Sequence, residues 1–325
     1  MSRFILTLCF SALLFAQGPT LLILEKGQSA LGFYSLAGQS LASVPVGPHP
    51  HEMVLSADGR YLYCTDNGTM QIEQPGVGNN TVSIVDVTTR KKAGEINLGN
   101  YRRPHGIDLD RATGTLYVTT ELPDQLLAID TATRKIVRTY DTKGKTSHMV
   151  TLGRGAKFAY VSNSNSSSVS AIELAAGNVT TIPTGGRPEG TVLSGDGSRL
   201  YTANREGNNI TIIDTAKNEA LGEIKTGKGT NRITLTPDGS RLVYSAMLDQ
   251  RVEIADPVSR KVLGQVALDG EPVSLNLSKD GKLAYASVQD KDTVYVISVA
   301  DQKIVRQFKT AAGAAPDPVM ELTRR

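Results

Sequence analysis

All four histidines of the chain lie in short segments that precede strand-like runs. They are His49 and His51 in Gly-Pro-His-Pro-His-Glu, His105 in Arg-Pro-His-Gly, and His148 in Thr-Ser-His-Met. Three histidines with a carboxylate form the donor set that zinc and related divalent ions prefer, and this set leaves a position open for water or substrate. The segments mark a candidate site if the fold brings them together.

A repeat of about 43 residues determines where these segments lie. Glycines that end an extended segment recur at Gly47, Gly99, Gly144, Gly185, Gly227, Gly270 and Gly313, with spacings of 52, 45, 41, 42, 43 and 43. Each unit contains four short runs of β-branched and aromatic residues separated by Gly, Asn, Asp or Pro, which is typical of a four-stranded antiparallel sheet. A period of this length, without a Leu ladder or a helical period, predicts the blades of a β-propeller.

The second and third strands of several units resemble the YVTN family of β-propeller repeats. The segments that carry the resemblance are Tyr-Val-Thr-Thr at 117–120, Tyr-Val-Ser-Asn at 160–163, Tyr-Thr-Ala-Asn at 201–204, and the runs 80–88 and 209–216. None matches the family motif verbatim, and the resemblance covers residues 20–322. It implies an all-β propeller and, as is usual for this repeat class, a binding scaffold.

The number of blades follows from the two ends of the chain. Six complete units fill the sequence from Gly47 to Gly313, while residues 21–24, 30–34 and 41–46 match the last three strands of a unit that lacks its first. Residues 316–322 match the opening of a unit. We therefore predict seven four-stranded antiparallel blades, with the last blade closed by N- and C-terminal strands, because such a join leaves no open sheet edge.

Residues 1–16 have the pattern of an export signal. Arg3 precedes an apolar run of 13 residues that is too short for a membrane span, and Ala16-Gln17 offers a cleavage point. We expect residues 17–325 to form a single propeller domain, a monomer that is periplasmic or extracellular and has no membrane span. That domain would contain one cysteine, Cys64. A net charge of +3 does not favour nucleic acid as a partner.

One position of the repeat begins the innermost strand of each blade, and it carries most of the candidate ligand-binding residues. We take that position to be His51, His105, His148, Glu189, Arg232, Val273 and Asp317. Neighbouring links add Arg102, Arg103, Arg187 and Arg205, which predict a basic margin of exposed charges whose replacement costs little stability. The three histidines are the candidate metal ligands, with Glu189 or Asp66 as a further ligand or general base.

The largest irregularity of the repeat is an insertion of ten residues within 69–79. It belongs on the face that carries the blade-to-blade links, where a long loop can act as a lid, contact a partner or be surface decoration.

Three functions are compatible with these features. The first is a scaffold that binds a protein, a glycan or a small anionic ligand on this face. The second is a metal-dependent lyase or lactonase-like hydrolase that uses His51, His105 and His148 with a divalent metal ion. The third is a haem or copper redox protein. The absence of an attachment motif in the sequence argues against this third function.

Overall fold

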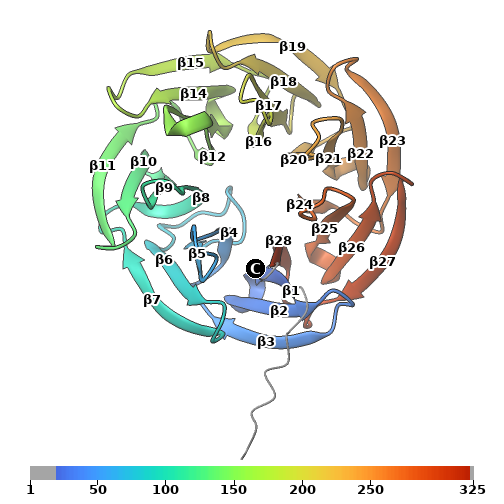
Figure 1. Cartoon of the computed structure of the whole chain (residues 1–325), viewed down its shortest axis with the longest axis horizontal. Helices are drawn as coiled ribbons and strands as arrows, with labels where there is room; N and C mark the ends of the chain where they lie inside the picture. The colour runs from blue at the N-terminus through green and yellow to red at the C-terminus, as the bar shows by residue number, and fades with distance from the viewer. Residues whose placement is uncertain (1–19, 323–325) are drawn as a thin grey trace, which may run out of the picture.

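The computed structural model describes residues 20–322, which form seven four-stranded antiparallel sheets around a central channel (Figure 1). The predicted all-β, seven-bladed propeller is confirmed. Residues 20–322 contain no α-helix; their helical segments are short 3-10 turns, η1 Lys26–Gln28, η2 Arg154–Ala156, η3 Ser164–Ser166, η4 Met247–Asp249 and η5 Gln289–Lys291. In this part of the chain no helix is long and apolar enough to cross a membrane. The predicted export signal lies outside the described residues.

Each blade runs from an innermost strand at the channel to an outermost strand at the rim. Blade 1 consists of β4 Pro50–Leu55, β5 Tyr61–Asp66, β6 Thr81–Asp86 and β7 Lys91–Asn97; blade 2 of β8 Arg102–Asp110, β9 Thr115–Leu122, β10 Asp124–Asp130 and β11 Lys135–Asp141; blade 3 of β12 Ser147–Leu152, β13 Phe158–Asn163, β14 Ser168–Glu173 and β15 Val179–Pro183. Blade 4 consists of β16 Pro188–Leu193, β17 Arg199–Asn204, β18 Asn209–Asp214 and β19 Glu219–Lys225; blade 5 of β20 Thr230–Leu235, β21 Leu242–Ala246, β22 Arg251–Asp256 and β23 Lys261–Ala267; blade 6 of β24 Pro272–Leu277, β25 Leu283–Val288, β26 Thr293–Ser298 and β27 Lys303–Lys309.

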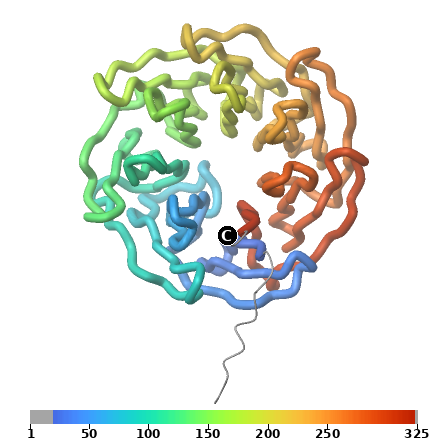
Figure 2. The backbone as a smooth tube through the Cα atoms, viewed as in Figure 1, coloured from blue at the N-terminus to red at the C-terminus, as the bar shows by residue number. Residues whose placement is uncertain are grey.

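Blade 7 joins the two ends of the described chain. Its strand order is β28-β1-β2-β3, with β1 Thr20–Glu25, β2 Ala30–Ser35, β3 Ser40–Pro45 and β28 Pro316–Leu322. The register pairs Thr20 with Leu322 and Glu25 with Pro316. A buried ion pair of 3.1 Å between Lys26 Nζ and Asp317 Oδ2 adds to this join. The blue and red ends of the chain therefore lie side by side in one sheet (Figure 2), as the sequence predicts.

The hydrophobic core lies between neighbouring blades. Ile84 and Ile96 of blade 1, for example, pack in one cluster with Ile107 and Leu116 of blade 2. The outermost strands bury little: in β7 only Ile96 is buried, and the remaining side chains are exposed or half-buried. Because each blade contributes both faces of its sheet to the core, β-branched and aliphatic residues dominate the second and third strands.

Every innermost strand has a bulge at the channel. In β4 the register shifts between Pro50 and Met53, so that two residues, His51 and Glu52, lie opposite Thr65 alone. In β20 the corresponding shift lies between Thr230 and Ile233. The registers thus align His51 with Asn231, and the prediction that Arg232 occupies this repeat position is wrong by one residue. A bulge redirects side chains, and here it turns the residues of each inner strand toward the channel.

Asp66, which ends β5, has a structural role rather than the predicted catalytic or ligand role. Its Oδ1 accepts a hydrogen bond of 3.0 Å from the Gly47 amide, and its Oδ2 accepts one of 2.8 Å from the Ser83 hydroxyl. The equivalent residue of blade 4, Asn204, makes the matching contact, in which Nδ2 donates to Thr211 Oγ1 over 2.8 Å. Asp66 therefore holds the link between blades 7 and 1 in place.

Replacing Asp66 with Asn is expected to stabilise the protein increasingly as the pH rises. Burial raises the pKa of Asp66 to about 6, against about 3.9 in the unfolded chain, so the wild type loses stability between pH 4 and pH 6, where the unfolded chain releases this proton while the buried carboxyl keeps it. The difference in unfolding free energy between D66N and wild type should grow by about 2–3 kcal/mol over this range. Denaturant titrations at several pH values would measure it.

The matched control is Asp58→Asn in an exposed turn. Hydrogen bonds from the Ser56 hydroxyl and the Arg60 amide lower the pKa of Asp58, so its contribution to stability is present at high pH and is lost on acidification. D58N should therefore show the opposite trend. A D66N difference that does not depend on pH would contradict the prediction.

Candidate functional site

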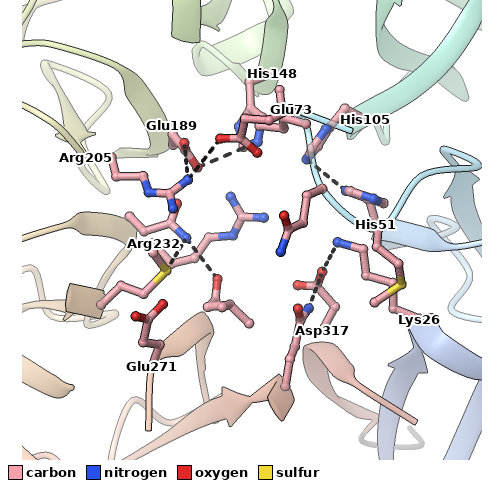
Figure 3. A pocket seen from close by; sticks show the side chains of 17 residues that line it. Lys26, His51, Glu73, His105, His148, Glu189, Arg205, Arg232, Glu271 and Asp317 are labelled. Carbon is pink, nitrogen blue, oxygen red and sulfur yellow. Dashed lines mark hydrogen bonds and ion pairs between the residues drawn. The ribbon is translucent and has the colours of Figure 1, made fainter. Parts of the chain in front are cut away.

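Seven residues, one from each inner strand, surround one end of the channel. They are His51, His105, His148, Glu189, Asn231, Val273 and Asp317, and all of them line a cavity of about 380 Å³. We call this cavity the channel mouth (Figure 3); its other lining residues are Lys26, Met70, Gln71, Ile72, Glu73, Arg205, Arg232, Met247, Glu271 and Gln289. The sequence-predicted His51, His105, His148, Glu189, Arg232, Asp317 and Arg205 therefore meet in one place.

Hydroxyl groups from the second strands fix the backbone of this ring. Thr65 Oγ1 donates to the carbonyl of His105 over 2.7 Å, and Thr119 Oγ1 donates to that of His148 over 2.5 Å. Ser162 and Ser287 bind the carbonyls of Glu189 and Asp317 in the same way, over 2.7 and 2.9 Å. Four of the seven channel residues are thus held by the preceding blade, which restricts the motion of the ring.

The three histidines on consecutive blades are in direct contact. His51 Nδ1 lies 3.3 Å from His105 Nε2, and the ring centroids of His105 and His148 are 3.8 Å apart. All three side chains are buried, and this burial lowers the pKa of each well below its ordinary value. The imidazoles are therefore neutral at neutral pH, so each can accept one proton.

Hydrogen bonds connect His51, His105 and Glu121 in a chain. His51 Nε2 lies 2.8 Å from the Thr69 carbonyl, which can only accept, so this nitrogen carries the proton and Nδ1 accepts from His105 Nε2. His105 Nδ1 lies 3.0 Å from Glu121 Oε1. One proton must therefore be shared between His105 and Glu121. Burial raises the pKa of Glu121 to about 7, which favours the form with the proton on the carboxyl.

This arrangement is a hydrogen-bonded chain rather than a set of metal ligands. Within residues 20–322 no three His, Cys, Asp or Glu side chains are placed to hold a metal ion. The nitrogens of His51 and His105 that face one another are joined by a hydrogen bond. The predicted metal role of His51, His105 and His148 has no support in this geometry.

Carboxylates neutralise the cations around the channel mouth. Arg232 Nη2 lies 2.6 Å from Glu52 Oε1, across the ring from blade 5 to blade 1. Arg187 Nε lies 3.0 Å from Glu189 Oε1. The lining residues include three cations, Lys26, Arg205 and Arg232, and four carboxylates, Glu73, Glu189, Glu271 and Asp317. The predicted basic margin is therefore not present at this cavity.

The four arginines of that margin have different environments. Arg103 is buried, with Nε 2.7 Å from Glu121 Oε2, and it donates to the carbonyls of Ile72 and Gln74. Arg187 has a side chain only 14% exposed. Arg102 and Arg205 are half-buried, and of these two only Arg205 lines the channel mouth. The prediction that these charges are exposed is wrong for Arg103 and Arg187.

The insertion at 69–79 lies over the channel mouth, on the predicted face. Met70, Gln71, Ile72 and Glu73 all line the cavity, and Figure 1 shows the loop reaching from blade 1 toward the centre of the ring. Glu73 forms ion pairs with Arg187 and Arg205 of blade 4. The insertion is thus a lid that contacts the opposite side of the channel.

Four buried polar atoms of the channel mouth have no hydrogen-bond partner among residues 20–322. They are His148 Nδ1, Asn231 Oδ1, Arg232 Nη1 and Asp317 Oδ1. An unpartnered buried polar atom is destabilising, and such atoms are rare in folded proteins. Four on one cavity indicate that an occupant, a polar ligand or ordered water, completes the site.

Sequence reasoning missed Lys26, Glu52 and Asn231. Lys26 lies outside the repeat position because η1 brings it to the channel from the loop after β1. Glu52 could have been found as the second residue of the bulge, but its pairing with Arg232 joins strands 180 residues apart. The hydroxyl column at Thr65, Thr119, Ser162 and Ser287 was a signal in the sequence, since it recurs at one repeat position.

Solved structures with the same fold have low sequence identity to this chain. A functionally unknown protein from Desulfotomaculum acetoxidans DSM 771 has a TM-score of 0.77 at 15% identity, covering 94% of this chain and 99% of that one. Hydrazine synthase from Kuenenia stuttgartiensis has a TM-score of 0.69 at 18% identity, with coverages of 80% and 86%. Dihydro-heme d1 dehydrogenase NirN in complex with DHE has a TM-score of 0.67 at 16% identity, with coverages of 93% and 74%. These similarities show the fold alone.

A family model gives a more specific relationship. No curated protein sequence matches the chain. The model described as "Lactonase, 7-bladed beta-propeller" matches residues 32–227, which include β4 to β19 and the three channel histidines. That match spans more than half of the sequence, and the chain belongs to the seven-bladed β-propeller lactonase family.

Proposed function

We propose that the protein binds a polar lactone at the channel mouth and hydrolyses its ester bond by general-base catalysis. The observation that carries the proposal is the cluster of neutral histidines beside an arginine with an unpartnered Nη1, in a cavity with further unpartnered polar atoms. Membership of the lactonase family supports the same reaction class. The YVTN-type repeat motifs describe the scaffold that carries this site.

The charges favour a substrate rich in hydroxyl groups at the reacting end. Each of the three cations of the channel mouth is paired with a carboxylate, so that a free carboxylate there would have to displace an existing partner. A hydroxylated lactone ring can instead donate to Asp317 Oδ1 and Asn231 Oδ1 without disturbing an ion pair. A cavity of about 380 Å³ is large enough for one such ring.

Three residues have roles in the proposed reaction. His148, kept neutral by burial, takes a proton from water as the water oxygen attacks the lactone carbonyl. Arg232 donates to the carbonyl oxygen as negative charge develops on it. Glu189, whose Oε2 lies 3.9 Å from His148 Nε2, stabilises the imidazolium, which then returns the proton to the leaving ring oxygen. The product is the open hydroxy acid, so that atoms and protons balance.

Ring opening of a panel of sugar lactones would test the proposal. Each turnover releases a carboxylic acid, so a pH indicator in weak buffer measures the rate without a coupled enzyme. Hydrolysis that saturates with substrate is the expected result. Rates equal to those of the uncatalysed lactones across the panel would reject it.

A scaffold that binds a ligand without turnover is the second candidate. The lid at 69–79 favours it, because ion pairs of Glu73 hold this loop over the channel mouth. Calorimetric titration with the corresponding hydroxy acids and polyols separates the two functions: a scaffold binds them and hydrolyses no lactone.

A further inference from the structure

A second cavity of about 340 Å³ lies beside the channel mouth. It is lined by Arg187, Arg205, Glu206, Asn208, Lys228 and Leu248, and Arg205 lines both cavities. Three of its lining residues are cations and one is a carboxylate. Its electrostatic character therefore differs from that of the channel mouth, where carboxylates outnumber cations.

The cations of this cavity have different partners. Arg187 Nη1 lies 3.6 Å from Glu206 Oε1, and its Nε is paired with Glu189. Lys228 is exposed, and no residue in 20–322 pairs with its ammonium group. Arg205 has a side chain 29% exposed, with Nη1 3.6 Å from Glu73. The cavity thus has one free ammonium group and two guanidinium groups at its border with the channel mouth.

The lid carboxylate occupies the border between the two cavities. Glu73 contacts both Arg187 and Arg205, and it is the only acidic residue of the insertion 69–79. Figure 3 shows Glu73 beside Arg205. Its side chain is 52% exposed, so the ion pairs are not closed off from solvent. A carboxylate on an exposed loop that bridges two arginines occupies the position in which an oxyanion of a ligand would bind.

We propose that Arg187, Arg205 and Lys228 form a subsite for a carboxylate or phosphate group, and that this group competes with Glu73 for the two arginines. Anion binding and lid opening are then coupled, because the anion replaces the contact that holds the lid. This proposal depends on the proposed function in one respect only, which is that the rest of the ligand lies at the channel mouth.

Binding of inorganic phosphate and of malonate, measured by calorimetry at low ionic strength, tests the subsite. The Glu73→Gln variant should bind phosphate or malonate, whichever the subsite accepts, with an affinity roughly fivefold or more above that of wild type, because the competing carboxylate is gone. Lys228→Gln should bind it roughly two- to fivefold more weakly. The matched control is Glu95→Gln on β7, where a carboxylate of similar exposure, 51%, also pairs with a basic residue.

A second measurement follows the lid itself. In wild type, the bound anion should increase amide hydrogen exchange in residues 69–79, whereas Glu95→Gln should behave as wild type in both assays. Equal anion affinity in wild type and Glu73→Gln, or binding that is unchanged by Lys228→Gln, would overturn the proposal. Both assays work without turnover, so loss of the lactonase reaction and loss of the subsite are separate outcomes.

Discussion

Replacing His148 with Gln is expected to lower kcat for lactone hydrolysis by about 10²–10⁴-fold, the range typical of a lost general base. Glutamine is polar and close in size, so it can occupy the buried position beside Glu189 without creating a cavity. The melting temperature should change by only a few degrees. Steady-state kinetics with the best lactone of the panel and thermal melts of both proteins measure the two effects.

The fourth histidine provides the control. His49 lies in the link before β4, outside the channel mouth, with Nδ1 3.1 Å from the Lys26 carbonyl. His49→Gln should retain the wild-type kcat. An equal kcat for wild type and His148→Gln would remove His148 from the mechanism.

The dependence of kcat/KM on pH also tests the role of His148 as the general base. Because burial lowers the pKa of His148, the neutral base persists as the solution is acidified through pH 6.5, where an exposed histidine would be half protonated. The value of kcat/KM should therefore stay level from pH 8 to below 6.5 and decline only at lower pH. A decline centred at pH 6.5 would indicate an exposed group as the base.

Removing residues 316–325 is expected to lower the melting temperature by at least 10 °C or to prevent folding. The deletion removes β28, with buried Val319 and Leu322 and the partner of the Lys26 ion pair. Two such side chains contribute about 3–6 kcal/mol by burial alone. One kcal/mol shifts the melting temperature by about 2–4 °C in domains approaching this size. Calorimetry or circular dichroism would record the shift.

The closest control is a chain that ends at Leu322. It retains all of β28, so its melting curve should match that of the full chain. The interpretation of β28 as the closing strand would be contradicted by an unchanged melting curve for the longer deletion.

The fold could be predicted because it depends on local patterns that recur. Turn residues at fixed spacing and alternating β-branched runs define each blade, and the missing strand at one end matches the extra strand at the other. The histidines could be placed on one ring for the same reason. Each of these statements uses only the position of a residue within its own unit.

The environments of the charged residues could not be obtained in this way. Arg103 is buried because the insertion of blade 1 folds over it and supplies two carbonyls, and nothing within blade 2 encodes that contact. Glu52 and Arg232 meet across the channel, so their pairing depends on the curvature of the closed ring. The one-residue error at Arg232 was avoidable from the sequence, because Asn231 lies seven residues before Asp238 of the following turn, just as His51 lies seven residues before Asp58.

Because blade 7 combines β1 with β28, the ring can close only after β28 has been synthesised. Strand β1 is among the first described segments to leave the ribosome, yet its partner β28 is the last. Before β28 is synthesised, the other six blades can form their sheets, while the edge of β1 stays unpaired. Lys26 also lacks its ion-pair partner Asp317, which lies 291 positions later in the sequence. Closure of the ring therefore distinguishes chains that contain β28 from chains that end before it: a chain without β28 would expose the unpaired β1 edge that quality-control proteases and chaperones can bind.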